Sequence, residues 1–312
     1  MAPKVCVLLC TYNGEKYLER QLESVFGQKN VELQILVHDD GSTDGTADIL
    51  SKYNIPVIGS EHLGAAHGFF YLMEHAPEAD YYAFCDQDDV WDRDKLSAAI
   101  NSIDRELEKF GGYRASKVGI KSEENLQKPM LYACSTRLVD QDENFLQTHI
   151  ADPSRTLTSR LFYSSISGNT MVFNKQLKNI AVMHHPKDMV MHDSWMVKLC
   201  VAIGGGLVVD REPHMDYRMH GNNVVGMELN LKQKIEKFRR VVRSKGEGQE
   251  LIDICSLYGA MIRSEYRRMA DAVQKTRTDA SARKTFVKDF NVDFKNKGFN
   301  MAFGLKVKKG NL

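Results

Sequence analysis

The first 110 residues alternate between short apolar runs and segments with helical periodicity, and this alternation constrains the fold more than any other feature. The apolar runs cover residues 4–10, 33–38, 56–58 and 81–85. Each run is followed by a segment with apolar residues at helical spacing, such as Leu18, Leu22 and Val25 after the first. Repeated strand–helix units of this kind predict an α/β fold with an open, mostly parallel sheet and helices on both faces.

Three of the predicted strands end in polar clusters. The clusters are Thr11-Tyr12-Asn13, Asp39-Asp40 and Asp86-Gln87-Asp88-Asp89. In open α/β sheets, ligands bind beyond the carboxyl ends of the strands. The sequence therefore predicts one binding site to which all three clusters contribute.

The stretch FCDQDDVW places three carboxylates, those of Asp86, Asp88 and Asp89, within four positions behind an apolar run. Like charges at this spacing repel one another, more strongly where water is excluded. A divalent cation such as Mg²⁺ or Mn²⁺ held by Asp86 and Asp88, with phosphate oxygens and water completing the shell, would offset the repulsion. An arginine or solvent could also do so, and an exposed acidic turn with Asp89 or Asp92 as a helix cap is the plainer interpretation.

The stretch DDGSTDGT also has two interpretations. It suits a tight turn, with Thr43 or Asp44 capping the following helix. Alternatively, Asp39 accepts a hydrogen bond from the imide of a pyrimidine base, and Tyr12 offers a ring near that base.

The segments LLCTYNGEKYLERQLESV, VHDDGSTDGTADIL and FCDQDDVW, in this order, resemble the start of an inverting family 2 glycosyltransferase of GT-A fold, over about residues 4–226. The resemblance implies a Rossmann-like sheet and a nucleotide-diphosphate-sugar donor. Thr11 and Asp39 match the family's nucleobase contacts, with Tyr12 beside them. Asp86 and Asp88 match its D-x-D pair, the first near ribose and metal and the second on the metal. The donor site is predicted to include the neighbouring residues Asn13, Asp40 and Gln87.

The segments HDSWMVKLCVAIGG and YRMHGNNVVG resemble the bacterial rhamnosyltransferase-like branch of this family. The resemblance makes Asp193 the catalytic base, which removes the proton of an acceptor hydroxyl as the glycosidic bond forms. It also implies transfer of L-rhamnose from dTDP-β-L-rhamnose with inversion. The alternative role for Asp193 is the N-cap of a helix that begins at Ser194.

Two further residues have open alternatives. His220 either ligates the metal or contacts the diphosphate, or it is a loop histidine bonded to the backbone. Arg218 either binds phosphate in the donor site or pairs with Asp210 or Asp216.

The acceptor side is expected to be formed by a separate set of residues. These are Asp89, Trp91, Gly168, Asn169, His192 and Trp195. Trp195 is equally consistent with a place in the core.

The sequence predicts a GT-A domain over residues 1–227, with a nucleotide-sugar half at 1–110 and an acceptor half at 130–227. A basic, mainly helical region is predicted for 228–312, including a long helix over about 250–275. Residues 232–245 carry many cations and an apolar stripe. They are typical of a solvated or packed helix, of a peripheral membrane contact, or of a homodimer helix.

Composition excludes several function classes. The formal net charge of +1 creates no field that would recruit nucleic acid. The six cysteines form no C-x-x-C pair, which favours a reducing compartment. We find no signal peptide and no membrane-spanning run, so the sequence predicts a cytoplasmic protein, at most peripheral on the inner face of the plasma membrane. The turn TYNGEK lacks the G-x-G-x-x-G pattern of dinucleotide-dependent dehydrogenases.

Together these observations predict a metal-dependent hexosyltransferase that adds L-rhamnose to a growing bacterial cell-surface polysaccharide or lipid-linked glycan. Two alternatives stay open. One is the same chemistry with a UDP-hexose donor, and the other is a catalytically silent nucleotide-sugar-binding subunit.

Overall fold

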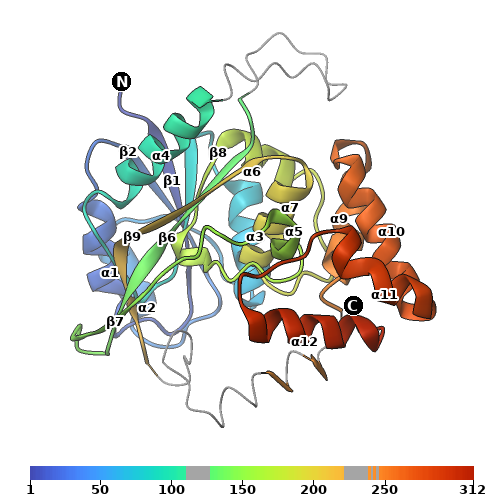
Figure 1. Cartoon of the computed structure of the whole chain (residues 1–312). Coiled ribbons are helices and arrows are strands. Elements are labelled where there is room, and N and C mark those ends of the chain that lie inside the picture. Colours follow the sequence, from blue (N-terminus) through green and yellow to red (C-terminus); the bar gives the residue numbers. More distant parts are fainter. Residues whose placement is uncertain (110–126, 221–237, 240–241, 244–245) are drawn as a thin grey trace. The chain divides into compact units, whose positions relative to one another are not determined.

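The structure, a computed structural model, describes residues 1–109, 127–220, 238–239, 242–243 and 246–312 (Figure 1). The chain forms two compact units. The first comprises Met1–Pro153, Ile166–Asp193 and Gly205–Val224, and the second comprises Ser154–Ser165, Ser194–Gly204 and Val225–Leu312. The boundary predicted at residue 227 lies outside the described residues, and so does most of the basic segment 232–245.

The described part of the first unit is built on a nine-stranded sheet with the order β3-β2-β1-β4-β8-β6-β9-β5, in which β7 pairs with β6. Its strands are β1 (Lys4–Thr11), β2 (Glu32–Asp39), β3 (Val57–Gly59), β4 (Tyr81–Cys85), β5 (Val90–Trp91), β6 (Met130–Val139), β7 (Phe145–His149), β8 (Val172–Asn174) and β9 (Gly206–Arg218). Strands β1 to β4 run parallel, as do β6 and β9, whereas β8, β5 and β7 are antiparallel to their neighbours. The predicted α/β class with a mostly parallel sheet is confirmed.

The register of the central strands brings their carboxyl ends together. Thr11 at the end of β1 lies opposite Asp39 at the end of β2. Leu9 of β1 lies opposite Cys85, the last residue of β4. All three polar clusters of the sequence therefore lie at one edge of the sheet.

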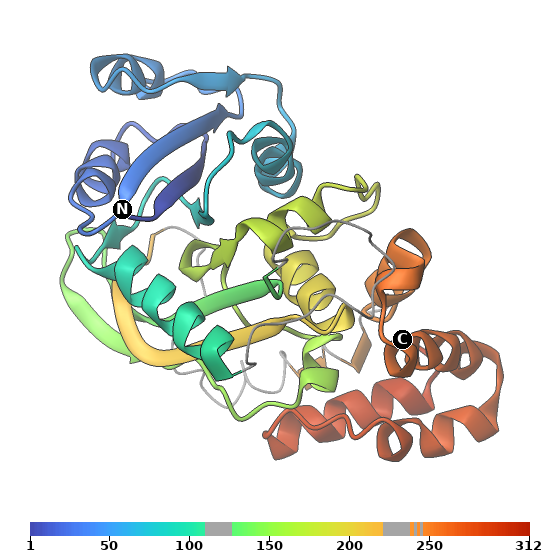
Figure 2. The same cartoon turned by 90° about the horizontal axis from the view of Figure 1, so that it is seen from above.

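Helices cover both faces of this sheet (Figures 1 and 2). They are α1 (Leu18–Phe26), α2 (Thr46–Lys52), α3 (Gly64–His75), α4 (Lys95–Lys109) and α6 (Lys175–Ala181). Alternate residues of β1, such as Val5 and Val7, share a core with the apolar residues of α1 and α4. On the opposite face Phe84 packs against Phe69 of α3, with ring centroids 5.1 Å apart.

The apolar pattern of the sequence predicts two short strands, at 207–210 and 215–219, but this prediction is wrong, because the whole segment forms the single strand β9. The turn-like residues between them do not end the strand. Pairing with β6 continues from Met130 opposite Gly206 to Val139 opposite Arg218, and irregularities near Ser135 absorb the break in the pattern.

The described part of the second unit is helical. It contains α5 (Leu157–Arg160), α9 (Gln249–Tyr258), α10 (Ser264–Thr278), α11 (Ala280–Asp289) and α12 (Lys297–Lys308), and α7 (His192–Ala202) runs into it from the first unit. The single helix predicted over 250–275 is wrong, because Gly259 takes a φ of 28° and the chain turns before α10 begins. No helix in the described ranges has the length and hydropathy to cross a bilayer.

Aromatic residues form the core of the second unit. The ring of Phe162 lies 5.0 Å from that of Phe303, which lies 5.2 Å from Phe294. Beside them the buried ammonium of Lys306 pairs with Glu247 and donates to the hydroxyl of Tyr163 over 2.9 Å. The C-terminal extension is thus helical, as the sequence predicts.

Candidate active site

Gln87 joins the loop after β4 to the loop after β1. Its Oε1 accepts from the Thr11 hydroxyl at 2.6 Å and from the Tyr12 backbone N–H at 2.8 Å. Its Nε2 donates to the Tyr12 carbonyl at 3.0 Å. A Cβ on Gly14 would collide with this amide, so only glycine permits the close approach. The contact fixes Tyr12, whose side chain is half exposed, at the edge of the sheet.

Asn13 and Ser42 connect the loops after β1 and β2. The Asn13 N–H donates to Ser42 Oγ at 2.8 Å, and Asn13 Oδ1 accepts from the Thr43 N–H at 2.9 Å. Ser42 Oγ in turn donates to Asp39 Oδ1 at 2.5 Å. This network orients the Asp39 carboxylate, the predicted nucleobase contact, and leaves it nearly buried.

The Asp40 carboxylate binds the start of α3. It accepts from the N–H groups of Leu63 at 2.6 Å and Gly64 at 2.9 Å, where the helix presents unpaired donors. His62 Nδ1 lies 2.9 Å from its other oxygen. The role of Asp40 in nucleotide binding stays a prediction, but its present partners give it a structural task.

The three carboxylates of the D-Q-D-D stretch lie close together. One ligand atom from each of Asp86, Asp88 and Asp89 falls within 4.8 Å of the others, a spacing that suits one hard cation. Burial, then Asp88 and then Asp193 raise the pKa of Asp86 to about 7. Burial, followed by Asp88 and Asp86, raises the pKa of Asp89 well above its usual range. The repulsion anticipated from the sequence is present, and a bound cation would relieve it.

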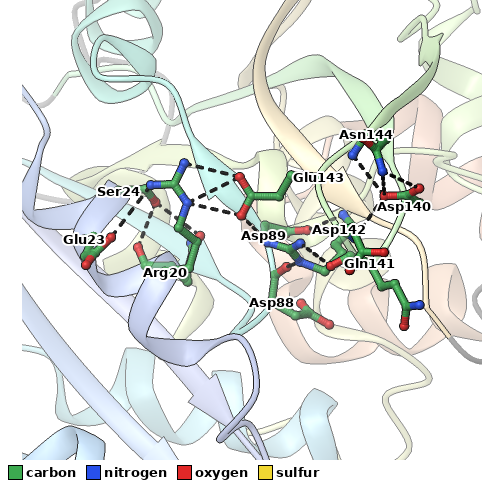
Figure 3. Close-up of polar contacts among 12 residues, drawn as sticks. Arg20, Glu23, Ser24, Asp88, Asp89, Asp140, Gln141, Asp142, Glu143 and Asn144 are labelled. Carbon is green, nitrogen blue, oxygen red and sulfur yellow. Dashed lines mark hydrogen bonds and ion pairs between the residues drawn. The ribbon is translucent and has the colours of Figure 1, made fainter.

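Arg218 is buried beside this loop, and its guanidinium bonds to groups other than the carboxylates of the cluster. Its Nε donates to the Asp88 carbonyl at 2.9 Å, Nη1 donates to the Gln141 carbonyl at 2.9 Å, and Nη2 pairs with Glu143 at 3.0 Å. Glu143 also pairs with Arg20, and the Glu143 and Arg20 side chains face each other in Figure 3. The suggested pairing of Arg218 with Asp210 or Asp216 is wrong, because Asp216 binds Arg137 at 2.5 Å and Asp210 accepts from the Tyr132 hydroxyl.

His220 lies directly on the acidic cluster. Its Nε2 is 2.6 Å from Asp88 Oδ2, and its ring stacks on Tyr17 with centroids 5.2 Å apart. The Arg218 guanidinium lies over the same Tyr17 ring, 4.8 Å from the ring centroid. Tyr17 and Glu143 were not singled out from the sequence, because only the fold shows that they touch these residues.

The residues predicted for the acceptor side are buried. Exposed fractions are 1% for Asp89, 3% for Trp91, 0% for Asn169, 4% for His192 and 1% for Trp195, and Gly168 is buried as well. Trp195 belongs to the second unit, whereas the others belong to the first. Their contact with an acceptor stays a prediction.

His192 packs between two aromatic rings. Its ring centroid lies 4.1 Å from that of Phe69 and 4.7 Å from that of Phe84. Neither of its ring nitrogens has a hydrogen-bond partner among the residues that the structure describes, and burial lowers the pKa of His192 to about 3. A Cβ on Gly168 would overlap His192 Nε2.

We therefore expect Gly168→Ala to lower the free energy of unfolding by about 1–3 kcal/mol, because the wedged His192 ring has no room to shift. Urea denaturation followed by circular dichroism would measure the loss. Gly304→Ala is the matched control, since a Cβ there meets nothing within 4 Å in helix α12. Equal effects of the two substitutions would contradict the prediction.

Asp193 is the second residue of α7, because the helix begins at His192. The alternative that Asp193 caps a helix starting at Ser194 is therefore wrong in detail. A carboxylate in the first turn is stabilised by the helix dipole. Asp193 also lies near enough to Asp86 to raise its pKa. The charge of Asp193 therefore acts on the acidic cluster, and its role as the catalytic base stays a prediction.

The glycosyl transferase family 2 model matches residues 6–166, which is more than half of the chain. The chain belongs to glycosyl transferase family 2. This assignment confirms the family predicted from the motifs, and with it the activity class of a glycosyltransferase.

Curated relatives agree with the family, and a solved structure shares the fold. The chain is 29% identical over 266 residues to the dTDP-rhamnosyl transferase RfbG of Shigella flexneri, covering 80% of this chain and 83% of that protein. It is 31% identical over 107 residues to the abequosyltransferase RfbV of Salmonella typhimurium, covering 31% of this chain and 32% of that protein. The structure of S. aureus TarS 1–349 in complex with UDP aligns over 98% of this chain and 88% of that one, with a TM-score of 0.53 and 16% identity. The last comparison shows a shared GT-A fold.

Proposed function

We propose that this family 2 enzyme is an inverting rhamnosyltransferase that transfers L-rhamnose from dTDP-β-L-rhamnose to a growing bacterial cell-surface glycan. One observation carries the proposal. The carboxylates of Asp86, Asp88 and Asp89 lie together at the carboxyl edge of the sheet, and the negative charge of Asp193 raises the pKa of Asp86. A base and a diphosphate site in one place are what glycosyl transfer requires.

The donor is proposed from sequence similarity. The relative that matches over most of both chains is named as a dTDP-rhamnosyl transferase. The thymine of dTDP presents an imide N–H, and the Asp39 carboxylate held by Ser42 is an acceptor for such a donor. The half-exposed Tyr12 ring lies at the same edge and offers a surface on which a base can stack.

In the proposed reaction, Asp193 accepts the proton of an acceptor hydroxyl. The hydroxyl oxygen forms a bond to the anomeric carbon from the face opposite the leaving group. The bond between that carbon and the diphosphate oxygen breaks, and the dTDP keeps the electron pair. The anomeric centre is inverted, so a β-L-rhamnosyl donor gives an α-L-rhamnoside.

A divalent cation, Mg²⁺ or Mn²⁺, fits the acidic cluster. Asp86 and Asp88 would hold it, with His220 beside Asp88. Carboxylate oxygens at this spacing are the donors that such hard cations prefer, and burial together with mutual repulsion raises the pKa values of Asp86 and Asp89. When bound, the cation would stabilise the negative charge of the departing diphosphate.

Calorimetric titration with dTDP, UDP and GDP, with and without Mn²⁺, tests the donor and the metal. We expect Mn²⁺-dependent binding in which dTDP is preferred. Preference for UDP would replace the donor by a UDP-hexose and leave the chemistry unchanged. If a folded protein bound no nucleotide, it would not be an active transferase, and a catalytically silent subunit would be the better description.

A further inference from the structure

Lys95 is a buried cation near the acidic cluster. It is the first residue of α4, and its exposed fraction is 0%. Its Nζ donates to the Asn169 carbonyl at 2.7 Å and lies 3.2 Å from the centroid of the Trp91 ring. Burial lowers the pKa of Lys95 to about 8, against the attraction of anions that include Asp89 and Asp86.

Asn169 connects this ammonium to the loop after β4, which holds Asp86, Asp88 and Asp89. Its Nδ2 donates to Asp89 Oδ2 at 2.5 Å, and Asp89 Oδ1 accepts from the Arg218 N–H at 3.3 Å. Every member of the chain Lys95–Asn169–Asp89–Arg218 is at most 3% exposed. The chain crosses four elements, from α4 through the 3₁₀ helix η1 (Gly168–Thr170) and the loop after β4 to β9.

Burying the Lys95 ammonium costs free energy, and packing alone does not explain why a charged side chain occupies this position. Removing an ammonium from water is expensive, and a methionine would fill similar space among the apolar neighbours without that cost. A buried charge next to the candidate site therefore points to a role in that site.

We propose that Lys95 is a positioning residue of the diphosphate–metal site. By holding Asn169 it fixes Asp89, and Asp89 fixes the loop on which Asp86 and Asp88 stand. Its charge offsets part of the repulsion within the cluster before a donor arrives. This inference rests on the proposed function, because it presupposes that the cluster binds a cation.

The direction in which the Kd for a divalent cation changes when Lys95 is replaced distinguishes a positioning role from a simple charge effect. Removing a positive charge near a cation site should tighten cation binding if geometry is unchanged. Removing a positioning residue should weaken it, as loss of supporting partners commonly does by about 10- to 100-fold. The two roles thus predict opposite shifts in the dissociation constant.

The test measures Mn²⁺ binding by electron paramagnetic resonance and the unfolding free energy by urea denaturation. We expect Lys95→Met to raise the Kd for Mn²⁺ about tenfold or more. The matched control is Lys178→Met, which removes another nearly buried lysine above an aromatic ring, Tyr82, away from the cluster. This control should leave the Kd within a factor of about two.

Asn169→Ala cuts the same connection from the other side and serves if Lys95→Met does not fold. If Lys95 acts through Asn169, the double substitution should raise the Kd no further than the larger single effect. Unchanged or tighter Mn²⁺ binding in Lys95→Met or, where that variant does not fold, in Asn169→Ala would overturn the inference and leave the proposed function intact. A wild-type protein that binds no Mn²⁺ would instead refute the metal site.

Discussion

Replacing Asp193 with asparagine is expected to lower kcat by about 10²- to 10⁴-fold, because asparagine cannot take up the acceptor proton. The substitution keeps the shape of the side chain in the first turn of α7. It also removes a negative charge that raises the pKa of Asp86, so nucleotide binding should not weaken. Transfer assays with the donor found by titration would measure kcat, and calorimetry would measure the Kd for the nucleotide.

The matched control for this experiment is Asp188→Asn. Asp188 is an exposed carboxylate five residues before Asp193 and outside any helix, so its loss should change kcat by less than about twofold, as is usual for surface substitutions. Full activity of Asp193→Asn would rule out Asp193 as the base. Loss of nucleotide binding together with kcat would mean that Asp193 acts in the donor site instead.

Much of the first unit could be predicted from the sequence, because its strands are continuous apolar runs and its helices are amphipathic. A strand buried on both faces, such as β4, appears in the sequence as a continuous run of apolar residues. Strand β7 leaves none, because its residues are mostly exposed and polar and apolar residues do not alternate. The two-residue strand β5 is too short for any periodic pattern, and it exists because Val90 and Trp91 meet β9.

Some residues of the candidate site could likewise be predicted from the sequence, and others could not. Thr11, Asp39 and Asp86 were found because they follow strands whose ends the topology brings together. Lys95 was not found, because a lysine at the start of an amphipathic helix normally faces water. Its burial depends on Asn169 and Trp91, which are separate in the sequence. The sequence thus predicts the charged groups of the candidate site. Which groups compensate their charge depends on packing between segments that are distant in the sequence.

The second large effect is expected at Asp88. Its carboxylate belongs to the acidic cluster, and its like charge raises the pKa of both Asp86 and Asp89. Asp88→Asn removes one anionic ligand of similar shape, so we expect Mn²⁺ affinity to fall by about 100-fold or more. The same change relieves repulsion in the unliganded protein, and the new amide oxygen can still accept from His220 Nε2, so the free energy of unfolding at neutral pH should not decrease.

These two outcomes together distinguish a metal ligand from a structural residue. If Asp88 were a structural carboxylate, its replacement would lower the free energy of unfolding. If Asp88 is a metal ligand held against repulsion, its replacement weakens only cation binding. Calorimetric Mn²⁺ titration and urea denaturation of the same preparation would measure both quantities. Asp188→Asn is the matched control, since Asp188 is an exposed carboxylate that belongs to neither group of described residues able to hold a cation. If Asp88→Asn bound Mn²⁺ as tightly as the wild type, the cation would not be held by this cluster, and the crowding of its carboxylates would need another explanation.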